Sequence, residues 1–227
     1  MHLILPLLIL LALVFGPSLW VRHVLAKYSQ PTDRYGGTGA ELARHLLDEH
    51  GLTDVPVERT DAGDHYDPQA RAVRLMPERY DNGSLTAISV AAHEVGHALQ
   101  DRDGYRPLRL RTRMVHSVRH LERLGAGLLM ASPFIGIATR VPGAGLLFFL
   151  GGILSLGSSA LVHLITLPTE FDASFGRALP LLGREGYLHP TDRPHARRIL
   201  TAAAMTYVAA ALMSLLNVAR WWAILRR

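Results

Sequence analysis

Four long apolar stretches interrupt the polar sequence of this chain of 227 residues. They cover Leu3–Val21, Leu124–Ala138, Gly143–Pro168 and Thr201–Leu225. The first stretch has 19 residues without a charge, which at a helical rise of about 1.5 Å per residue is just enough to cross a bilayer. The pattern therefore predicts a mainly α membrane protein with about four transmembrane helices.

A cleaved signal peptide is the alternative explanation of the first stretch. It would begin with a basic region and end at a small-x-small cleavage site, and this stretch has neither. Trp20 and Arg22 instead follow the apolar run, as is typical of a membrane–water interface. A retained anchor is therefore favoured. The second stretch is short and contains Pro133, so it either begins near Leu121 or inserts only partly.

The long polar segment after the first stretch predicts a small α+β domain. A T-x-x-E capping box at Thr38–Glu41 opens a helix, and Gly51 ends it. Alternating apolar and polar residues predict strands at Val55–Thr60 and Ala72–Leu75, and Asp64–Pro68 leads through a turn into the second strand. We expect the second strand to expose an edge, which could hold an extended peptide by backbone hydrogen bonds.

The most specific chemical pattern is His93-Glu94-x-x-His97, within a helix expected over Ser84–Gln100. Histidines four residues apart lie on one helix face, so both imidazoles can reach one Zn²⁺. Glu94 can then accept a proton from water whose pKa the metal lowers. The alternative is a surface helix with two unrelated histidines. The apolar residues around the motif predict a buried helix, where polar groups need partners, so a zinc site is favoured.

A catalytic zinc site usually has three protein ligands, so the two histidines need a third. The chain has no cysteine, which leaves histidine, aspartate and glutamate. Glu170 is a candidate because it follows the third apolar stretch, at the expected start of a helix beside the membrane. It could equally be a first-turn acid that interacts with the helix dipole after Pro168. Asp172 could hold a ligand histidine by a hydrogen bond, or be a solvated acid.

Five segments in order along nearly the whole chain carry a family resemblance. They are Gly37–Ala40, Asp64–Pro68 with Val73–Leu75, Ala91–Ala98, Thr166–Ser174 and Leu200–Ala210. Together they resemble the neutral zinc metallopeptidase family of bacterial membranes. The resemblance implies a zincin-like, gluzincin-type catalytic domain in which His93, His97 and Glu170 are the zinc ligands and Glu94 is the base. The chain departs from many gluzincins at Ser174, where an aspartate usually follows the third ligand by four residues.

Peptide hydrolysis also needs a group that stabilises the oxyanion of the transition state. His65, Tyr66 and Tyr207 are candidates, and the resemblance supports each of them. His65 could instead be a surface histidine in a turn, and Tyr207 an interfacial or core tyrosine.

The distribution of basic residues predicts the orientation in the membrane. Of the 24 lysines and arginines, 20 lie in segments 22–123 and 169–200, and four lie elsewhere. The positive-inside rule then places both polar segments in the cytoplasm and both termini outside. The net charge of +5 comes without interleaved aromatic residues, so we expect a solvated face near anionic lipid headgroups and no nucleic-acid partner. The absence of cysteine excludes disulfides and thiol chemistry.

These observations combine into an expected layout. It is an N-terminal transmembrane anchor at 1–21, a zincin-like catalytic domain at 22–123, a transmembrane hairpin at 124–168, a third-ligand helix with a connecting segment at 169–200, and a C-terminal transmembrane helix at 201–227. We expect a multi-pass zinc endopeptidase of the bacterial inner membrane, acting on membrane-associated or misfolded polypeptides. The alternatives are a non-catalytic adaptor with a structural zinc, which has no use for Glu94, and a zinc hydrolase of a non-peptide substrate.

Overall fold

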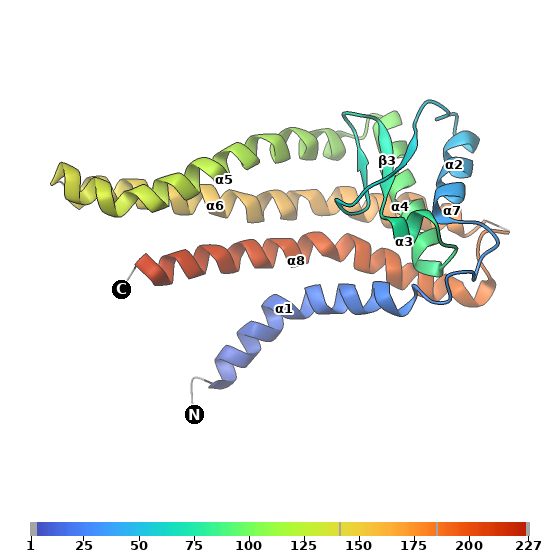
Figure 1. Ribbon diagram of the computed structural model, residues 1–227, viewed down its shortest axis with the longest axis horizontal. Helices are drawn as coiled ribbons and strands as arrows, with labels where there is room; N and C mark the ends of the chain where they lie inside the picture. Colours follow the sequence, from blue (N-terminus) through green and yellow to red (C-terminus); the bar gives the residue numbers. More distant parts are fainter. Residues whose placement is uncertain (1–3, 141, 185, 226–227) are drawn as a thin grey trace. The chain divides into compact units, whose positions relative to one another are not determined.

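The computed structural model describes residues 4–140, 142–184 and 186–225, and most of them are helical (Figure 1). The helices are α1 (Ile4–Lys27), α2 (Gly39–Glu49), α3 (Pro77–Tyr80), α4 (Leu85–Arg102), α5 (Arg106–Thr139), α6 (Pro142–Phe171), the π-helix η1 (Asp172–Ala178), α7 (Leu179–Leu182), the 3₁₀-helix η2 (Pro190–Asp192) and α8 (Arg193–Leu225). Three short strands complete the fold: β1 (Val57–Arg59), β2 (His65–Asp67) and β3 (Ala72–Leu75).

The chain divides into two compact units. The first unit comprises residues 1–17, 110–166 and 207–227, and the second comprises 18–109 and 167–206. Four helices, α1, α5, α6 and α8, therefore contribute residues to both units. The sheet and α4 belong to the second unit alone.

The first unit consists of helical segments rich in apolar residues. Helices α5 and α6 approach closely because Gly125 and Gly152 have no side chains: a Cβ on Gly152 would lie 2.5 Å from the Leu129 side chain. Within the described residues, the helical segment Pro190–Leu216 has the length and mean hydropathy, 1.9, of a membrane span. One of the four predicted spans thus has the length and hydropathy of a transmembrane helix in the structure, and the other three stay predictions.

In the second unit, α2 begins and ends as the sequence predicts. The Thr38 side chain accepts a hydrogen bond from the Glu41 backbone, and the Glu41 carboxylate accepts one from the Thr38 backbone at 2.8 Å. Gly51 has a φ of +71°, which is accessible to glycine at little cost and lets the chain leave the helix. The capping-box prediction is confirmed.

The sheet differs from the expectation because β3 lies at its centre. The strand order is β1-β3-β2, with β1 parallel and β2 antiparallel to β3. The Val73 N–H donates to the Pro56 carbonyl at 2.9 Å, so it is not available to a substrate. The prediction of an exposed β3 edge was wrong, since the residues before the predicted turn form β2, which pairs with β3 and in which Tyr66 packs into the core. The outer strands are β1 and β2.

Helix α4 is the core helix of the second unit. Ser84 caps its N-terminus by accepting a hydrogen bond from the Ala87 N–H at 3.1 Å. Every residue from Leu85 to Gln100 is buried. The helix packs against β2 and β3 on one part of its surface, and against α2 and η1 on others. Burial on all sides is what the mostly apolar sequence around the histidine motif predicts.

Hydrogen bonds to one buried carboxylate connect the start of α8 to the segment before α2. Asp192, which is 1% exposed, accepts hydrogen bonds from Arg34 at 2.6 and 2.7 Å and from the Tyr35 hydroxyl at 2.6 Å. A buried charge is tolerated only with such partners. These contacts fix the first turns of α8, whose Leu200 carbonyl reaches the site described next.

Candidate metal centre

Three side chains from two helices meet in the core of the second unit. His93 and His97 lie one turn apart on α4, and their Nε2 atoms are 3.2 and 3.4 Å from the same Oε2 atom of Glu170. The three ligand atoms lie within 4.8 Å of one another, and all three residues are buried. Two imidazoles and a carboxylate at this spacing match the donor set of a catalytic zinc site, so these residues fit the ion.

The position of Glu170 corrects one detail of the sequence interpretation. Pro168 lies inside α6, and Glu170 occupies the last turn of that helix, directly before η1. It is therefore not a first-turn acid at a helix start. Burial acts to raise the pKa of Glu170, but attraction to His97 and the hydrogen bond with His93 outweigh it and hold the pKa below its ordinary value. An ionised carboxylate is the form that binds a metal.

Each ligand histidine has a hydrogen-bond partner on its other ring nitrogen. His93 Nδ1 lies 3.0 Å from the Ser174 hydroxyl on η1. His97 Nδ1 lies 2.9 Å from the side-chain oxygen of Gln100 on α4. Outer partners of this kind orient a ligand imidazole toward a metal. The serine that departs from the usual gluzincin pattern therefore contacts a ligand histidine.

Asp172 does not contact a ligand histidine by any hydrogen bond that the described residues show. Its carboxylate accepts a hydrogen bond from the Gln100 amide at 2.8 Å and another from Arg177 at 2.9 Å. Gln100 thus stands between Asp172 and His97. Sequence reasoning missed Gln100, although its place three residues after His97 on the same helix face was a usable signal.

Glu94 lies on α4 between the two ligand histidines and is 6% exposed. Its position one residue after His93 follows directly from the helix that the sequence predicts. A carboxylate next to two metal ligands can accept a proton from water at the same site.

The three candidates for oxyanion stabilisation lie in different surroundings. The Tyr66 hydroxyl donates to Asp101 at 2.8 Å, and burial together with this bond raises the pKa of Tyr66. The Nδ1 of His65 lies 2.8 Å from the Gly63 carbonyl, so Nδ1 carries the proton and Nε2 of the neutral ring can only accept. Tyr207 belongs to the first unit, where the Arg111 guanidinium donates to its hydroxyl. Their catalytic roles stay predictions.

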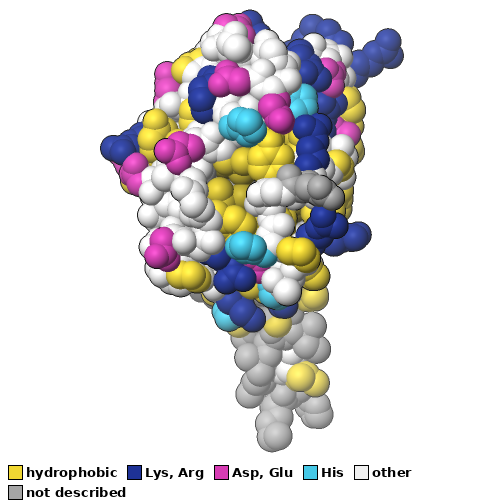
Figure 2. Space-filling model, turned by 90° about the vertical axis from the view of Figure 1, so that its right-hand side faces the viewer, with side chains coloured by type: hydrophobic (Ala, Val, Ile, Leu, Met, Phe, Trp, Pro, Cys, Tyr) yellow, Lys and Arg dark blue, Asp and Glu magenta, His cyan; other side chains and the backbone are white. Residues whose placement is uncertain are grey.

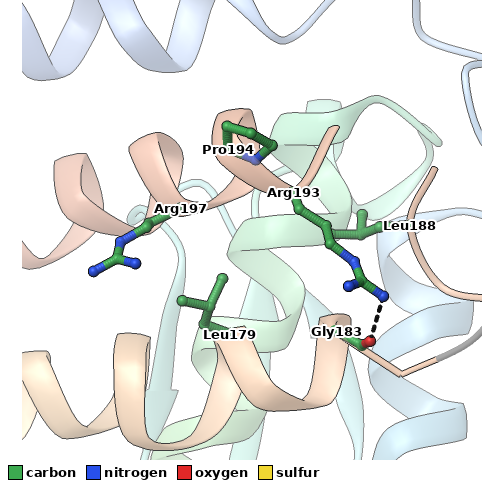
Figure 3. A pocket seen from close by; sticks show the side chains of 6 residues that line it. All are labelled: Leu179, Gly183, Leu188, Arg193, Pro194 and Arg197. Carbon is green, nitrogen blue, oxygen red and sulfur yellow. Dashed lines mark hydrogen bonds between the residues drawn. The ribbon is translucent and has the colours of Figure 1, made fainter. Parts of the chain in front are cut away.

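The second unit also has a pocket of about 430 Å³ whose lining contains none of the three ligand residues. It is lined by Leu179, Gly183, Leu188, Arg193, Pro194 and Arg197 (Figure 3). Arg193 donates to the Gly183 carbonyl at 2.8 Å. On the face at the right of Figure 1, hydrophobic side chains gather in a hollow bordered by charged ones (Figure 2). The residues that line this pocket include no carboxylate, histidine or hydroxyl side chain.

A buried pair of histidines four residues apart, met by a glutamate from another helix, defines the ligand class of gluzincin-type zinc hydrolases. The chain belongs to the family described as "Putative neutral zinc metallopeptidase", whose model matches residues 3–226. It is similar to "Putative membrane protease YugP" of Bacillus subtilis, with 40% identity over 213 residues, which cover 93% of this chain and 91% of that relative. No solved structure matches the chain.

Proposed function

We propose that this protein is an integral-membrane zinc metallopeptidase that hydrolyses peptide bonds. The observation that carries the proposal is the meeting of His93, His97 and Glu170 around one point, with the carboxylate of Glu94 on the same helix. A structural zinc site needs only ligands and has no use for a base beside them. An acid in that position serves proton transfer.

Each residue of the site has a separate role in the proposed hydrolysis. Zinc, when bound, supplies the Lewis acidity that lowers the pKa of water and polarises a carbonyl. Glu94 accepts the proton of the attacking water and returns it to the leaving amine, because its carboxylate is the acid–base group between the ligands. His93, His97 and Glu170 hold the metal. Burial of all four side chains strengthens these charge interactions by excluding bulk water.

The outer edge of β2 is the surface that we assign to the substrate backbone. Across the β2–β3 ladder, His65 lies opposite Arg74 and Asp67 lies opposite Ala72. The Val73 N–H points the other way and donates to the Pro56 carbonyl on the β1 side of the sheet. Backbone groups of successive strand residues point to opposite sides, so the Tyr66 N–H and C=O face outward from β2. Strand β2 also packs against α4, which carries the histidines. An extended peptide along this edge would lie beside the helix of the metal centre.

Backbone pairing along β2 can be tested without turnover. We expect the amide of Tyr66 to gain protection from hydrogen–deuterium exchange when an unstructured peptide is added to the Glu94→Gln protein, since that variant binds without cleaving. The amide of Val73, already bonded to Pro56, serves as the internal reference. Protection that appears elsewhere but not at Tyr66 would refute this docking edge.

The proposed position in the membrane determines which polypeptides can reach the metal centre. We propose four spans, with the second unit in the cytoplasm, on the basis of the four apolar stretches and the bias of basic residues. A peptidase held at the bilayer meets polypeptides that lie on or in the membrane. Because strand pairing recognises the backbone, we expect weak side-chain preference and cleavage of membrane-associated or misfolded chains.

Replacement of Glu94 tests the proposed activity most directly. The variant Glu94→Gln should keep about one zinc per chain but lose nearly all hydrolysis of an unstructured protein, because an amide cannot accept the proton. Purified wild-type protein with a chelator is the matched inactive control. Hydrolysis by Glu94→Gln near the wild-type rate would refute the mechanism. A wild-type protein that holds zinc but cleaves no polypeptide would indicate a structural zinc or a non-peptide substrate.

A further inference from the structure

The side chain of Gln100 is fixed on three sides within the core. Its amide nitrogen donates to the Thr169 carbonyl and to the Asp172 carboxylate, both at 2.8 Å. Both amide protons are thus used, and the amide oxygen is the atom that faces His97. Gln100 is 0% exposed, so no water competes for these bonds. The oxygen can only accept, so His97 must donate to it from Nδ1, which leaves Nε2 as the ring nitrogen available to a metal.

The backbone around Gln100 is shaped to receive it. The chain changes from α-helix to π-helix at Asp172, which widens the turn after Thr169 and leaves a carbonyl for the Gln100 amide. A Cβ on Gly176 would lie 2.7 Å from the Asp172 carboxylate, so glycine leaves room for that carboxylate. Arg177 then joins Asp172 at 2.9 Å to Asp103 at 2.6 Å.

Ser174 fixes the other ligand histidine in the same way. Its hydroxyl donates to the Leu200 carbonyl at 3.1 Å, so its single proton is committed. The contact of 3.0 Å with His93 must then be a hydrogen bond from Nδ1–H to the serine oxygen. This leaves Nε2 of His93 on the side of Glu170, where it is available to a metal. Ser174 is 0% exposed, and its partner Leu200 comes from α8.

We propose that Gln100 and Ser174 are the positioning residues of the metal centre, two neutral acceptors that hold the Nδ1 sides of His97 and His93 and so direct their Nε2 atoms toward the ion. The proposal rests on the proposed zinc peptidase function. It assigns to Asp172 and Arg177 a more remote role, the orientation of the Gln100 amide. On their Nδ1 sides both imidazoles then have neutral partners, and Glu170 is the single anionic ligand among the three.

The test is the zinc dissociation constant, measured by chelator competition on the purified full chain. We expect Gln100→Met, which keeps the volume, and Ser174→Ala, which removes one hydroxyl, to weaken zinc binding by about 10- to 100-fold each. Ser174→Thr, which restores the hydroxyl, should recover most of the affinity that Ser174→Ala loses. A merely structural role of Ser174 predicts no such recovery.

Ser89→Ala is the matched control. Ser89 is as buried as Ser174, lies on α4 one turn before His93, and its hydroxyl has no hydrogen-bond partner among the described residues. The zinc dissociation constant of the Ser89→Ala protein should equal that of the wild type. Wild-type affinity in both Gln100→Met and Ser174→Ala would overturn the positioning proposal. If the wild-type protein itself binds no zinc, it is the proposed function that fails.

Thermal unfolding of the metal-free proteins separates folding from metal binding. Ser174→Ala replaces one small residue by another and should fold, which keeps the proposal testable even if Gln100→Met does not. The visible spectrum of the cobalt-substituted protein provides a second readout, because a rotated imidazole changes the ligand field. An unchanged cobalt spectrum in a folded Ser174→Ala protein would count against the role of Ser174.

Discussion

Gly96→Ala should damage the metal centre although Gly96 has no side chain to contribute. Gly96 lies between Glu94 and His97, where α4 packs against the backbone of η1. A Cβ at this position would lie 2.7 Å from the Ala173 carbonyl oxygen and 3.3 Å from its Cα. Ordinary contact needs about 3.5 Å, so the two backbones would have to separate by about 0.8 Å.

The size of the effect follows from that displacement. Helix α4 carries both ligand histidines, whereas η1 is continuous with the turn that carries Glu170. Metal coordination tolerates about 0.2 Å, and a shift of about 0.8 Å exceeds this. Overpacking of a core costs about 1–3 kcal/mol. If zinc binding must bring α4 and η1 back together, it has to supply this free energy, so the zinc dissociation constant rises by about 5- to 150-fold.

Chelator competition and thermal unfolding measure the two consequences separately. Gly127→Ala in α5 is the control, because a Cβ at Gly127 meets nothing within 4 Å. That substitution should leave zinc binding unchanged and stabilise the helix by up to about 1 kcal/mol. If Gly96→Ala binds zinc as tightly as the wild type and unfolds at the same temperature, the close packing of α4 on η1 is not what holds the ligands together.

Three further predictions concern a tyrosine, the third ligand and the topology. Tyr66→Phe should lower the free energy of unfolding by about 1.5–3 kcal/mol, because Asp101 loses its hydroxyl donor; it should also lower kcat by about 100-fold or more if Tyr66 stabilises the oxyanion, and an unchanged kcat would exclude that role. Glu170→Gln should lose zinc in elemental analysis, since a neutral amide is a weaker ligand, and a full zinc content would exclude Glu170 as the third ligand. In intact cells, a membrane-impermeant thiol reagent should label Arg140→Cys but not Arg59→Cys, and the reverse pattern would invert the proposed orientation.

The local features of the fold were predictable because neighbouring residues determine them. The capping box at Thr38 and the strand Ala72–Leu75 need only a few adjacent side chains to be recognised. The exposed edge predicted for β3 was wrong because β2 pairs with it. Strand β2 is stabilised by that pairing and by the burial of Tyr66, neither of which is a local property.

The sequence by itself determined the ligand pair and the base of the candidate site. A helix has about 3.6 residues per turn, so His93 and His97 share a face wherever that helix lies, and Glu94 follows. The tertiary structure decided what these residues meet. Contacts from α4 to residues 69 and 81 positions away bring in Thr169 and Ser174, and no local pattern encodes such distances. Packing of buried, oriented polar groups is a property of the folded core, because each group needs a partner that only the complete fold supplies.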